Sequence, residues 1–594
     1  MDKNGNQQPR RRRTRGGVDG FSAPSQRKSA PLSPIQQPAV AEEDIIQPAP
    51  KSQAPQMSSN RPQQPGSMLN MTIPGGLSNR PPQKRTVEPT KKKRAKRSKK
   101  RIAFYSVLII VLLAVGAGVW DAWQLYHKVH RLSVGNLTAS VGGAENILVA
   151  GSTNRCNLKV QNAEWGFCSQ GVTGVNSDII FIVHVVPATH TVSLLSIPRD
   201  TFVPNARSGN EAFKIDAALY QGPTQLVDAV EEDFGIPIQH YAEVGFDGFV
   251  NIVNAVGGIK MDFPMPVYDS ESYLNVKTPG CRLLNGVEAL QVVRARHLQY
   301  KPPTITTNDH YYWPQEPESD IARIARTHEF LRVLASTVAG KGLSDPITDQ
   351  KLVDAIAPQI QVDSGFSTST MIALLQEFHQ VNINNVPQYT LPIVTTGFGS
   401  YDYKGSGYGD VVFPIEGTDQ QIINQFLGIS GSTNAMTGNP LPAPSSISVN
   451  IINGSGTPGQ ASKTATSLQS LGFNVNGTPT SATPVSSQAQ ETVVNYASTS
   501  TEGKALAVAK DLTGYVILSK NPAQVTAGSD VTVVTGTGLA VASTAAPTTA
   551  SSSSSTAAAS SSTSSSSSST TTSLGPVSPA NQPLSAWDPR ACAD

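Results

Sequence analysis

An uncharged apolar run of 19 residues at positions 102–120 constrains what this chain can fold into more than any other feature. At a rise of about 1.5 Å per residue, a helix of this length just spans a hydrocarbon core of about 30 Å. Nine Lys and Arg residues lie directly before the run, between positions 91 and 101. Because basic residues beside a span stay in the cytoplasm, we expect a single-pass membrane protein with its N-terminus inside and its bulk outside.

Two other interpretations of this run are weaker. A cleaved signal peptide has a shorter apolar region of about 7–15 residues and does not usually lie so far from the N-terminus. A buried helix of a soluble domain would show an amphipathic period, and none is visible. A retained signal-anchor therefore remains our prediction for the cell-membrane location.

The balance of basic and acidic residues changes sign at the start of the apolar run. Residues 1–101 hold 22 Lys/Arg and six Asp/Glu, whereas the remaining residues hold 24 Lys/Arg and 37 Asp/Glu. The first 90 residues are rich in Pro, Gln and Ser and lack apolar periodicity, so residues 1–101 are expected to form a disordered basic cytoplasmic tail. The arginines at 10–13 suit nucleic acid or anionic lipid, but a solvated tail explains them more simply.

The residues after the span alternate strand-like and helix-like patterns. Up to residue 395 this alternation predicts an extracytoplasmic α/β domain, an α-β-α sandwich at 141–395. Proline and glycine clusters predict a linker at 396–446. A smaller α/β domain is expected at 447–540, and the Ser/Thr/Ala-rich residues 541–594 are expected to be disordered.

All four cysteines lie on the outer, oxidising side of the predicted span, where disulfides are allowed. Cys156 and Cys168 enclose eleven residues and are able to bridge, and Cys281 is a further candidate, but the sequence does not decide how these three and Cys592 pair. A metal site is a poor alternative because no C-x-x-C or His pairing accompanies them.

Basic residues recur where the expected strands and helices end. Arg199 follows an expected strand at 191–197, Arg294 and Arg296 close a helix that opens with a capping box at 285–288, and Arg323 lies on a helix at 320–339. One such arginine alone is best explained as a solvated surface charge. Together with Lys214, these groups flanking one sheet predict a site for phosphate or pyrophosphate, since guanidinium groups form bidentate, charge-assisted hydrogen bonds.

Five motifs in order resemble the LytR-CpsA-Psr family. They are SLLSIPRDTFV (193–203), KIDAAL (214–219), FGIPIQHYAEVGFDGFVNIVNAVGGI (234–259), LNGVEALQVVRARH (284–297) and SDIARIARTHEF (319–330). The strands NILVAG and NSDIIFIV fit the start of that family's domain. The module at 447–536 resembles the LytR C-terminal domain of actinobacterial members, through VNIINGSG, LGFNV and VTVVTG.

The resemblance implies an enzyme, an extracytoplasmic phosphotransferase. It would move a wall glycopolymer from a polyprenyl-pyrophosphate carrier to a peptidoglycan hydroxyl, forming a phosphodiester link with Mg²⁺ (or Mn²⁺) as cofactor. The partners are then the lipid-linked polymer, peptidoglycan and the membrane, with no nucleic acid. Physical chemistry agrees, because phosphoryl transfer relies on positioning and on neutralising charge.

The resemblance also implies roles for single residues. The pyrophosphate would be bound by Arg199, Lys214, Arg294, Arg296 and Arg323. Catalysis would rest on Asp320 with Arg199, Arg294 and Arg323, while Asp178 would hold the metal and Asp200 would orient the basic groups. The apolar runs at 179–186 and 249–256 would line a slot for the polyprenyl tail, although ordinary core packing explains most of them.

Two positions depart from the family pattern. An acid common after the first strand is missing from Gly151-Ser152-Thr153-Asn154, and Thr327 stands where the family has Gln. Because Mg²⁺ completes its shell with phosphate oxygens and water, we expect weaker or substrate-dependent metal binding. The insertion at 300–317 carries Tyr and Trp residues that suit sugar stacking, and a surface loop without a role explains it equally well.

Two other functions remain open at this stage. One is a hydrolase that cleaves polyprenyl pyrophosphates with water as the acceptor. The other is a wall-binding scaffold without catalysis. A transcriptional regulator is excluded, because the candidate site lies outside and no helix-turn-helix pattern occurs in residues 1–101.

Overall fold

The computed structural model describes residues 127–593 apart from 141, 157, 159–165, 172, 318, 341–353, 368, 372, 375–380, 396–400, 416–418, 478–479, 482–489 and 542–582. The chain divides into two compact units, Met1–Ala95 and Lys96–Asp594, and every described residue belongs to the second. The expected cytoplasmic tail and the apolar run at 102–120 lie outside the described residues. Within the part that is described, no helix combines the length and the apolarity that crossing a membrane requires.

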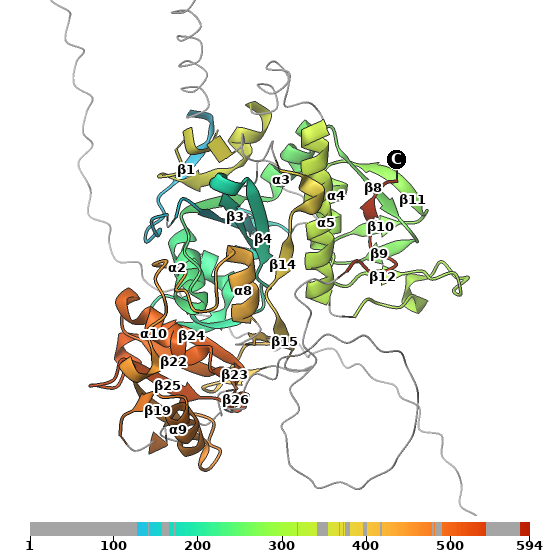
Figure 1. Cartoon of the computed structure of the whole chain (residues 1–594). Coiled ribbons are helices and arrows are strands. Elements are labelled where there is room, and N and C mark those ends of the chain that lie inside the picture. The colour runs from blue at the N-terminus through green and yellow to red at the C-terminus, as the bar shows by residue number, and fades with distance from the viewer. Residues whose placement is uncertain are drawn as a thin grey trace, which may run out of the picture. The chain divides into compact units, whose positions relative to one another are not determined.

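A seven-stranded sheet forms the centre of the first domain (Figure 1). Its strands in spatial order are β1 (His130–Leu132), β13 (Gln361–Asp363), β7 (His240–Val244), β2 (Glu145–Ser152), β3 (Ser177–Val186), β4 (Thr191–Ser196) and β14 (Gln388–Thr390). The central strand β2 pairs antiparallel with β3 and parallel with β7. The expected strand at 191–197 is β4, and the expected strands NILVAG and NSDIIFIV correspond to β2 and β3.

The two faces of this sheet are covered by different helices, because side chains alternate along each strand. On one face Leu148 of β2 and Ile182 of β3 are fully buried in a cluster that includes α2 (Pro223–Phe234). The other face meets three helices. These are α3 (Phe246–Ala255), α4 (Gly286–Arg294) and α5 (Ser319–Gly340). Their own core includes Val253, Leu290 and Phe330.

The capping box predicted at the start of α4 is present. The Asn285 side chain accepts hydrogen bonds from the backbone N–H groups of Val287 and Glu288, and a Glu288 carboxylate oxygen accepts from the Asn285 N–H at 2.9 Å. These bonds satisfy donors that a helix start leaves unpaired. The box therefore fixes where α4 begins, and so where Arg294 at its end lies.

Gly286 allows α3 and α4 to approach closely. A Cβ at this position would lie 2.2 Å from the Val250 carbonyl oxygen and 2.7 Å from its Cα. We expect Gly286→Ala to lower the free energy of unfolding by about 1–3 kcal/mol through overpacking, measured by thermal or urea unfolding. Gly245→Ala at the start of α3 is the matched control, since a Cβ there meets nothing within 4 Å. Equal stability of the two variants would contradict this account of the helix contact.

The predicted linker at 396–446 is wrong over much of its length. Strand β18 (Val412–Pro414) pairs antiparallel with β15 (Ile393–Thr395), and helix α8 (Asp419–Leu427) follows it. Ile423 and Phe426 of α8 are buried in the same core as Leu148. The short apolar face of α8 is embedded among polar and glycine residues, which made the segment resemble a linker.

The second domain is a small α/β fold with a six-stranded sheet. Five strands lie in the order β20 (Asn474–Val475), β19 (Ser448–Asn453), β25 (Val531–Thr535), β22 (Thr492–Tyr496) and β24 (Val516–Lys520), and β21 (Thr480–Ser481) also pairs with β19. Helices α9 (Gln460–Ser470) and α10 (Thr499–Ala509) pack on it, and Leu468, Val494 and Leu506 share one buried core.

The prediction of a disordered tail at 541–594 is wrong for its last residues. Residues 583–593 are described, and β27 (Arg590–Ala591) pairs antiparallel with β8 (Ile259–Phe263) of the first domain (Figure 1). Disulfides join Cys156 to Cys168 and Cys281 to Cys592. The second bridge connects positions 311 residues apart, which no local spacing could have revealed.

Candidate active site

Three of the basic side chains predicted from sequence converge on Asp200. Lys214 Nζ lies 2.9 Å from Asp200 Oδ1, Arg296 Nη2 lies 2.7 Å from Oδ2, and Arg199 Nε lies 3.5 Å from Oδ2. Arg199 and Asp200 belong to the turn after β4, Lys214 ends β6 (Glu211–Lys214), and Arg296 follows α4. One carboxylate therefore gathers cations from three separate segments.

A second carboxylate, Asp320 at the start of α5, extends the cluster. Its Oδ1 lies 3.2 Å from Arg296 Nε and 2.9 Å from Arg323 Nη2. Its Oδ2 is buried and has no hydrogen-bond partner among the described residues. Arg323 also donates to the backbone carbonyl of Asp178 at 2.7 Å, which ties α5 to the beginning of β3.

The third carboxylate, Asp178, forms an ion pair with Arg199. It lies where a polar pocket meets an apolar one, and it lines both together with Arg294 and Arg296. The polar pocket is completed by Arg199, Arg155 and several uncharged or exposed groups. The structure thus brings together all of the predicted site residues.

Burial and neighbouring charges act against each other in this cluster. Burial disfavours the charged form of Asp200, but Arg199, Arg296 and Lys214 outweigh it and hold its pKa below the usual value. For Asp216, burial prevails over the attraction of Arg199 and raises the pKa to about 7. Burial likewise opposes the charge of Arg199, yet the surrounding carboxylates keep its pKa above the usual value. The arginine therefore stays charged.

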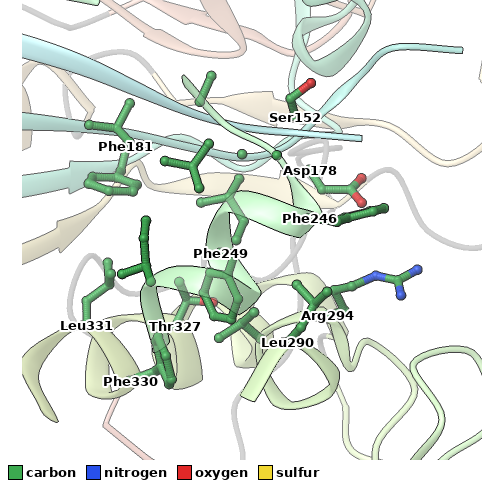
Figure 2. A pocket seen from close by; sticks show the side chains of 18 of the residues that line it. Ser152, Asp178, Phe181, Phe246, Phe249, Leu290, Arg294, Thr327, Phe330 and Leu331 are labelled. Carbon is green, nitrogen blue, oxygen red and sulfur yellow. The ribbon is translucent and has the colours of Figure 1, made fainter. Parts of the chain in front are cut away.

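The apolar pocket lies between the sheet and α3, α4 and α5. Figure 2 shows Asp178 and Arg294 at one end of it and Phe181, Phe330 and Leu331 at the other. The two apolar runs predicted to line a slot both contribute, the first through Ile179 and Phe181 and the second through Phe249, Ile252 and Val253. A slot with an apolar interior and a basic mouth fits an amphiphile with an anionic head group.

Two groups in the cluster were missed by the reasoning from sequence. Arg155 lines the polar pocket and its guanidinium lies 5.4 Å from the centre of the Phe246 ring. The Asp216 Oδ2 accepts a hydrogen bond at 3.3 Å from Asn176, which also lines the polar pocket. The sequence places both near residues that were predicted for the site. Arg155 directly follows the segment 151–154 after the first strand, and Asp216 stands two residues after Lys214.

A metal ion at this site would have few protein ligands among the described residues. Within the described residues, no group of three or more His, Cys, Asp or Glu side chains is arranged to hold a metal ion. Asp178 offers one carboxylate at the junction of the two pockets. Mg²⁺ in phosphate-transfer sites is commonly held by one or two carboxylates with substrate phosphates and water, and this donor set fits that mode.

The family model described as the LytR_cpsA_psr family matches residues 122–409. A polyisoprenyl-teichoic acid–peptidoglycan teichoic acid transferase of Bacillus subtilis, TagV, is 30% identical over 286 residues, which cover 46% of this chain and 70% of TagV. The chain belongs to the LytR-CpsA-Psr family. Its second domain, residues 446–538, matches the model described as LytR cell envelope-related transcriptional attenuator.

Other LytR-CpsA-Psr relatives extend the match along the chain. The cell wall biosynthesis protein LcpA of Corynebacterium glutamicum is 26% identical over 461 residues, which cover 71% of this chain and 83% of LcpA. A solved LytR-Csp2A-Psr enzyme from Actinomyces oris is 21% identical, with a TM-score of 0.38, and covers 51% of this chain and 97% of that one. Curated relatives of this chain thus include cell wall biosynthesis proteins and teichoic acid–peptidoglycan transferases.

The aromatic insertion at 300–317 is partly anchored. Trp313 is buried, and its indole N–H donates to the Thr307 carbonyl at 3.2 Å. Tyr311 and Tyr312 are 83% and 61% exposed. The insertion therefore keeps a fixed base and presents two tyrosines to solvent, where they can stack on sugar rings.

Proposed function

We propose that this protein transfers a wall glycopolymer from a polyprenyl-pyrophosphate carrier to a peptidoglycan hydroxyl. The observation that supports this most strongly is the apolar slot whose mouth is lined by Asp178, Arg294 and Arg296 and opens into the basic pocket. A polyprenyl tail suits the slot, and a pyrophosphate suits its mouth. The names of the relatives, such as the teichoic acid transferase TagV, support the same class of reaction.

The proposed chemistry assigns the cations to the phosphate oxygens. Arg199, Lys214, Arg294, Arg296 and Arg323 would neutralise the charge that builds up on the transferred phosphoryl group. In the described structure most of them are paired with Asp178, Asp200 or Asp320, which keeps these long side chains oriented before the substrate arrives. Such preorganisation reduces the cost of ordering them during the reaction.

Asp320 is proposed to assist the acceptor. A peptidoglycan hydroxyl oxygen attacks the phosphorus next to the polymer, the bond from that phosphorus to the bridging oxygen breaks, and polyprenyl monophosphate leaves. The hydroxyl proton passes to Asp320 Oδ2, which is buried and has no hydrogen-bond partner among the described residues. The products are a phosphodiester link and the lipid monophosphate.

We propose Mg²⁺ as the cofactor and Asp178 as its protein ligand. When bound, the ion would add positive charge beside the pyrophosphate oxygens. Because the described residues supply few other ligands, binding should depend on the substrate. We expect removal of divalent metal with EDTA to lower the transfer rate, and Mg²⁺ affinity to rise when pyrophosphate is present. A titration in which pyrophosphate leaves Mg²⁺ affinity unchanged would contradict this assignment.

We also propose that the run at 102–120 anchors the protein in the cell membrane, with the N-terminus in the cytoplasm and the LytR-CpsA-Psr domain outside. The nine bases before the run support this orientation. An anchor of this kind would hold the apolar slot near the bilayer, where a polyprenyl carrier resides.

Acceptor dependence tests the proposed transfer. Full-length protein is incubated with a polyprenyl-pyrophosphate-linked glycopolymer, with and without peptidoglycan, and release of polyprenyl monophosphate is measured. We expect release to require peptidoglycan. Equal release in its absence, with free phosphorylated polymer as product, would identify a hydrolase instead. No release in either case would favour a scaffold without catalysis.

A further inference from the structure

The end of the chain forms an ordered strap on the first domain. We call residues 583–593 the C-terminal strap. Arg590 and Ala591 pair with Asp262 and Met261 of β8, and the bridge from Cys281 to Cys592 fastens the end covalently. The strap is thus joined to the domain at several points.

Two further contacts bring the strap across the aromatic insertion and α5. The Trp587 ring stacks on Tyr300 at 3.9 Å with an interplanar angle of 6°. The Ala591 N–H donates to Glu329 Oε1 on α5 at 2.8 Å. The strap therefore contacts the aromatic insertion and α5, the helix that carries Asp320 and Arg323.

The strap also places a carboxylate in the interior. Asp588 is 1% exposed, and its Oδ1 accepts a hydrogen bond from Arg326 Nη1 at 2.9 Å. Its Oδ2 accepts from the Ser585 N–H at 2.8 Å, which fixes the rotamer of the carboxylate. Arg326 is fully buried on α5, so its charge needs partners inside the protein.

Glu316 of the aromatic insertion is the second partner of Arg326. Its Oε1 accepts from Arg326 Nη2 at 2.9 Å, and its Oε2 accepts from Nη1. Burial raises the pKa of Glu316 to about 7, although Arg326 opposes that rise. Asp588 therefore supplies a second carboxylate to a guanidinium that is fully buried.

The same guanidinium reaches the basic cluster through the backbone. Arg326 Nη2 donates to the Ala295 carbonyl oxygen at 2.6 Å. Ala295 is the extended residue that ends α4, with φ −62° and ψ 120°, and it lies between Arg294 and Arg296. Its carbonyl belongs to the peptide bond that joins it to Arg296, so the contact anchors the backbone directly between the two arginines.

We propose that Asp588 is a positioning residue for the anion site. It fixes the Arg326 guanidinium on the Ala295 carbonyl, and this contact holds Arg294 and Arg296 at the mouth of the apolar slot. Asp588 thereby supports a site formed by residues far from it in the sequence. Arg326, the residue that it contacts, lies 262 positions before it. The inference rests on the proposed function only in that the site binds pyrophosphate.

The test compares full-length Asp588→Asn with full-length Trp587→Ala. The first removes the counter-charge while Glu316 still pairs with Arg326, so the protein should fold. The second removes the stack on Tyr300 and leaves the Asp588–Arg326 contact in place. For each variant we measure Tm, the affinity for inorganic pyrophosphate by calorimetry, and hydrogen exchange of the amides at 294–298.

We expect Asp588→Asn to weaken pyrophosphate binding by about tenfold and to speed exchange at 294–298. Trp587→Ala should lower Tm while leaving the affinity nearly unchanged. A purely structural strap would instead make the loss of affinity follow the loss of Tm in both variants, which would overturn the proposal. Unchanged exchange in Asp588→Asn would also overturn it. If the unaltered protein bound no pyrophosphate, the proposed function would fail, and exchange alone would decide the coupling.

Discussion

Replacing Arg199 with alanine is expected to slow glycopolymer transfer by about 100-fold, the typical loss when one preorganised donor is removed from a charge-stabilising site. Arg199 is ion-paired with Asp178 and lies 3.5 Å from Asp200, so its removal takes a positive charge from the centre of the cluster. It also leaves Asp178 without its partner beside an incoming pyrophosphate. The measurement is the initial rate of phosphodiester formation with saturating donor and peptidoglycan.

The control for this variant is Arg282→Ala. Arg282 lines neither pocket and donates to the Thr278 carbonyl at 3.0 Å, so its loss removes one arginine without touching the cluster. We expect transfer by this variant to equal that of the unaltered protein. An Arg199→Ala protein that folds normally and retains full transfer would show that the cluster is a structural ion-pair network.

Placing a carboxylate in the slot, with Ile252→Glu, is expected to weaken binding of the lipid-linked donor by about 100-fold. Ile252 lies on α3, is half-buried and lines the apolar pocket. A charged group there would have to be desolvated, or would hold water where the polyprenyl tail belongs, and either outcome costs several kcal/mol. Affinity for inorganic pyrophosphate should be kept, because that ligand needs only the basic mouth.

Ala255→Glu is the matched control, since it adds the same side chain to the same helix at an exposed position. It should bind the lipid-linked donor normally. If Ile252→Glu and Ala255→Glu bound the donor equally well, the apolar pocket would be ordinary core and the tail would lie elsewhere.

Local patterns were sufficient to predict the elements that carry the site. The alternation of side chains along β2 and β3 and the capping box at Asn285 depend on neighbours within a few residues. They can therefore be recognised without knowledge of the tertiary structure. The basic residues were predicted as one site because they flank one expected sheet, with Arg199, Arg294 and Arg296 at the ends of a strand or helix. The structure adds which carboxylate each of them meets, since Asp200 and Asp320 are distant from most of their partners in sequence.

The features that sequence reasoning missed depend on long-range packing. Helix α8 has only a few apolar residues, and Phe426 is recognisable as core only once β4 is beside it. Asp588 stands after a long Ser/Thr-rich stretch, and nothing near it indicates that a buried arginine 262 residues earlier is its partner. The Ser/Thr/Ala-rich composition of residues 541–594 predicts disorder for the whole segment, although its residues 583–593 are ordered.

Mass spectrometry of the reaction product tests the proposed transfer most directly. Full-length protein is incubated with peptidoglycan and a lipid-linked glycopolymer whose polymer-side phosphate carries ¹⁸O at its non-bridging oxygens, and the wall is then digested with a muramidase. We predict a muropeptide joined to the polymer through one phosphate that retains the label, together with unlabelled polyprenyl monophosphate. Consumption of the donor without any labelled muropeptide would contradict the assignment as a transferase.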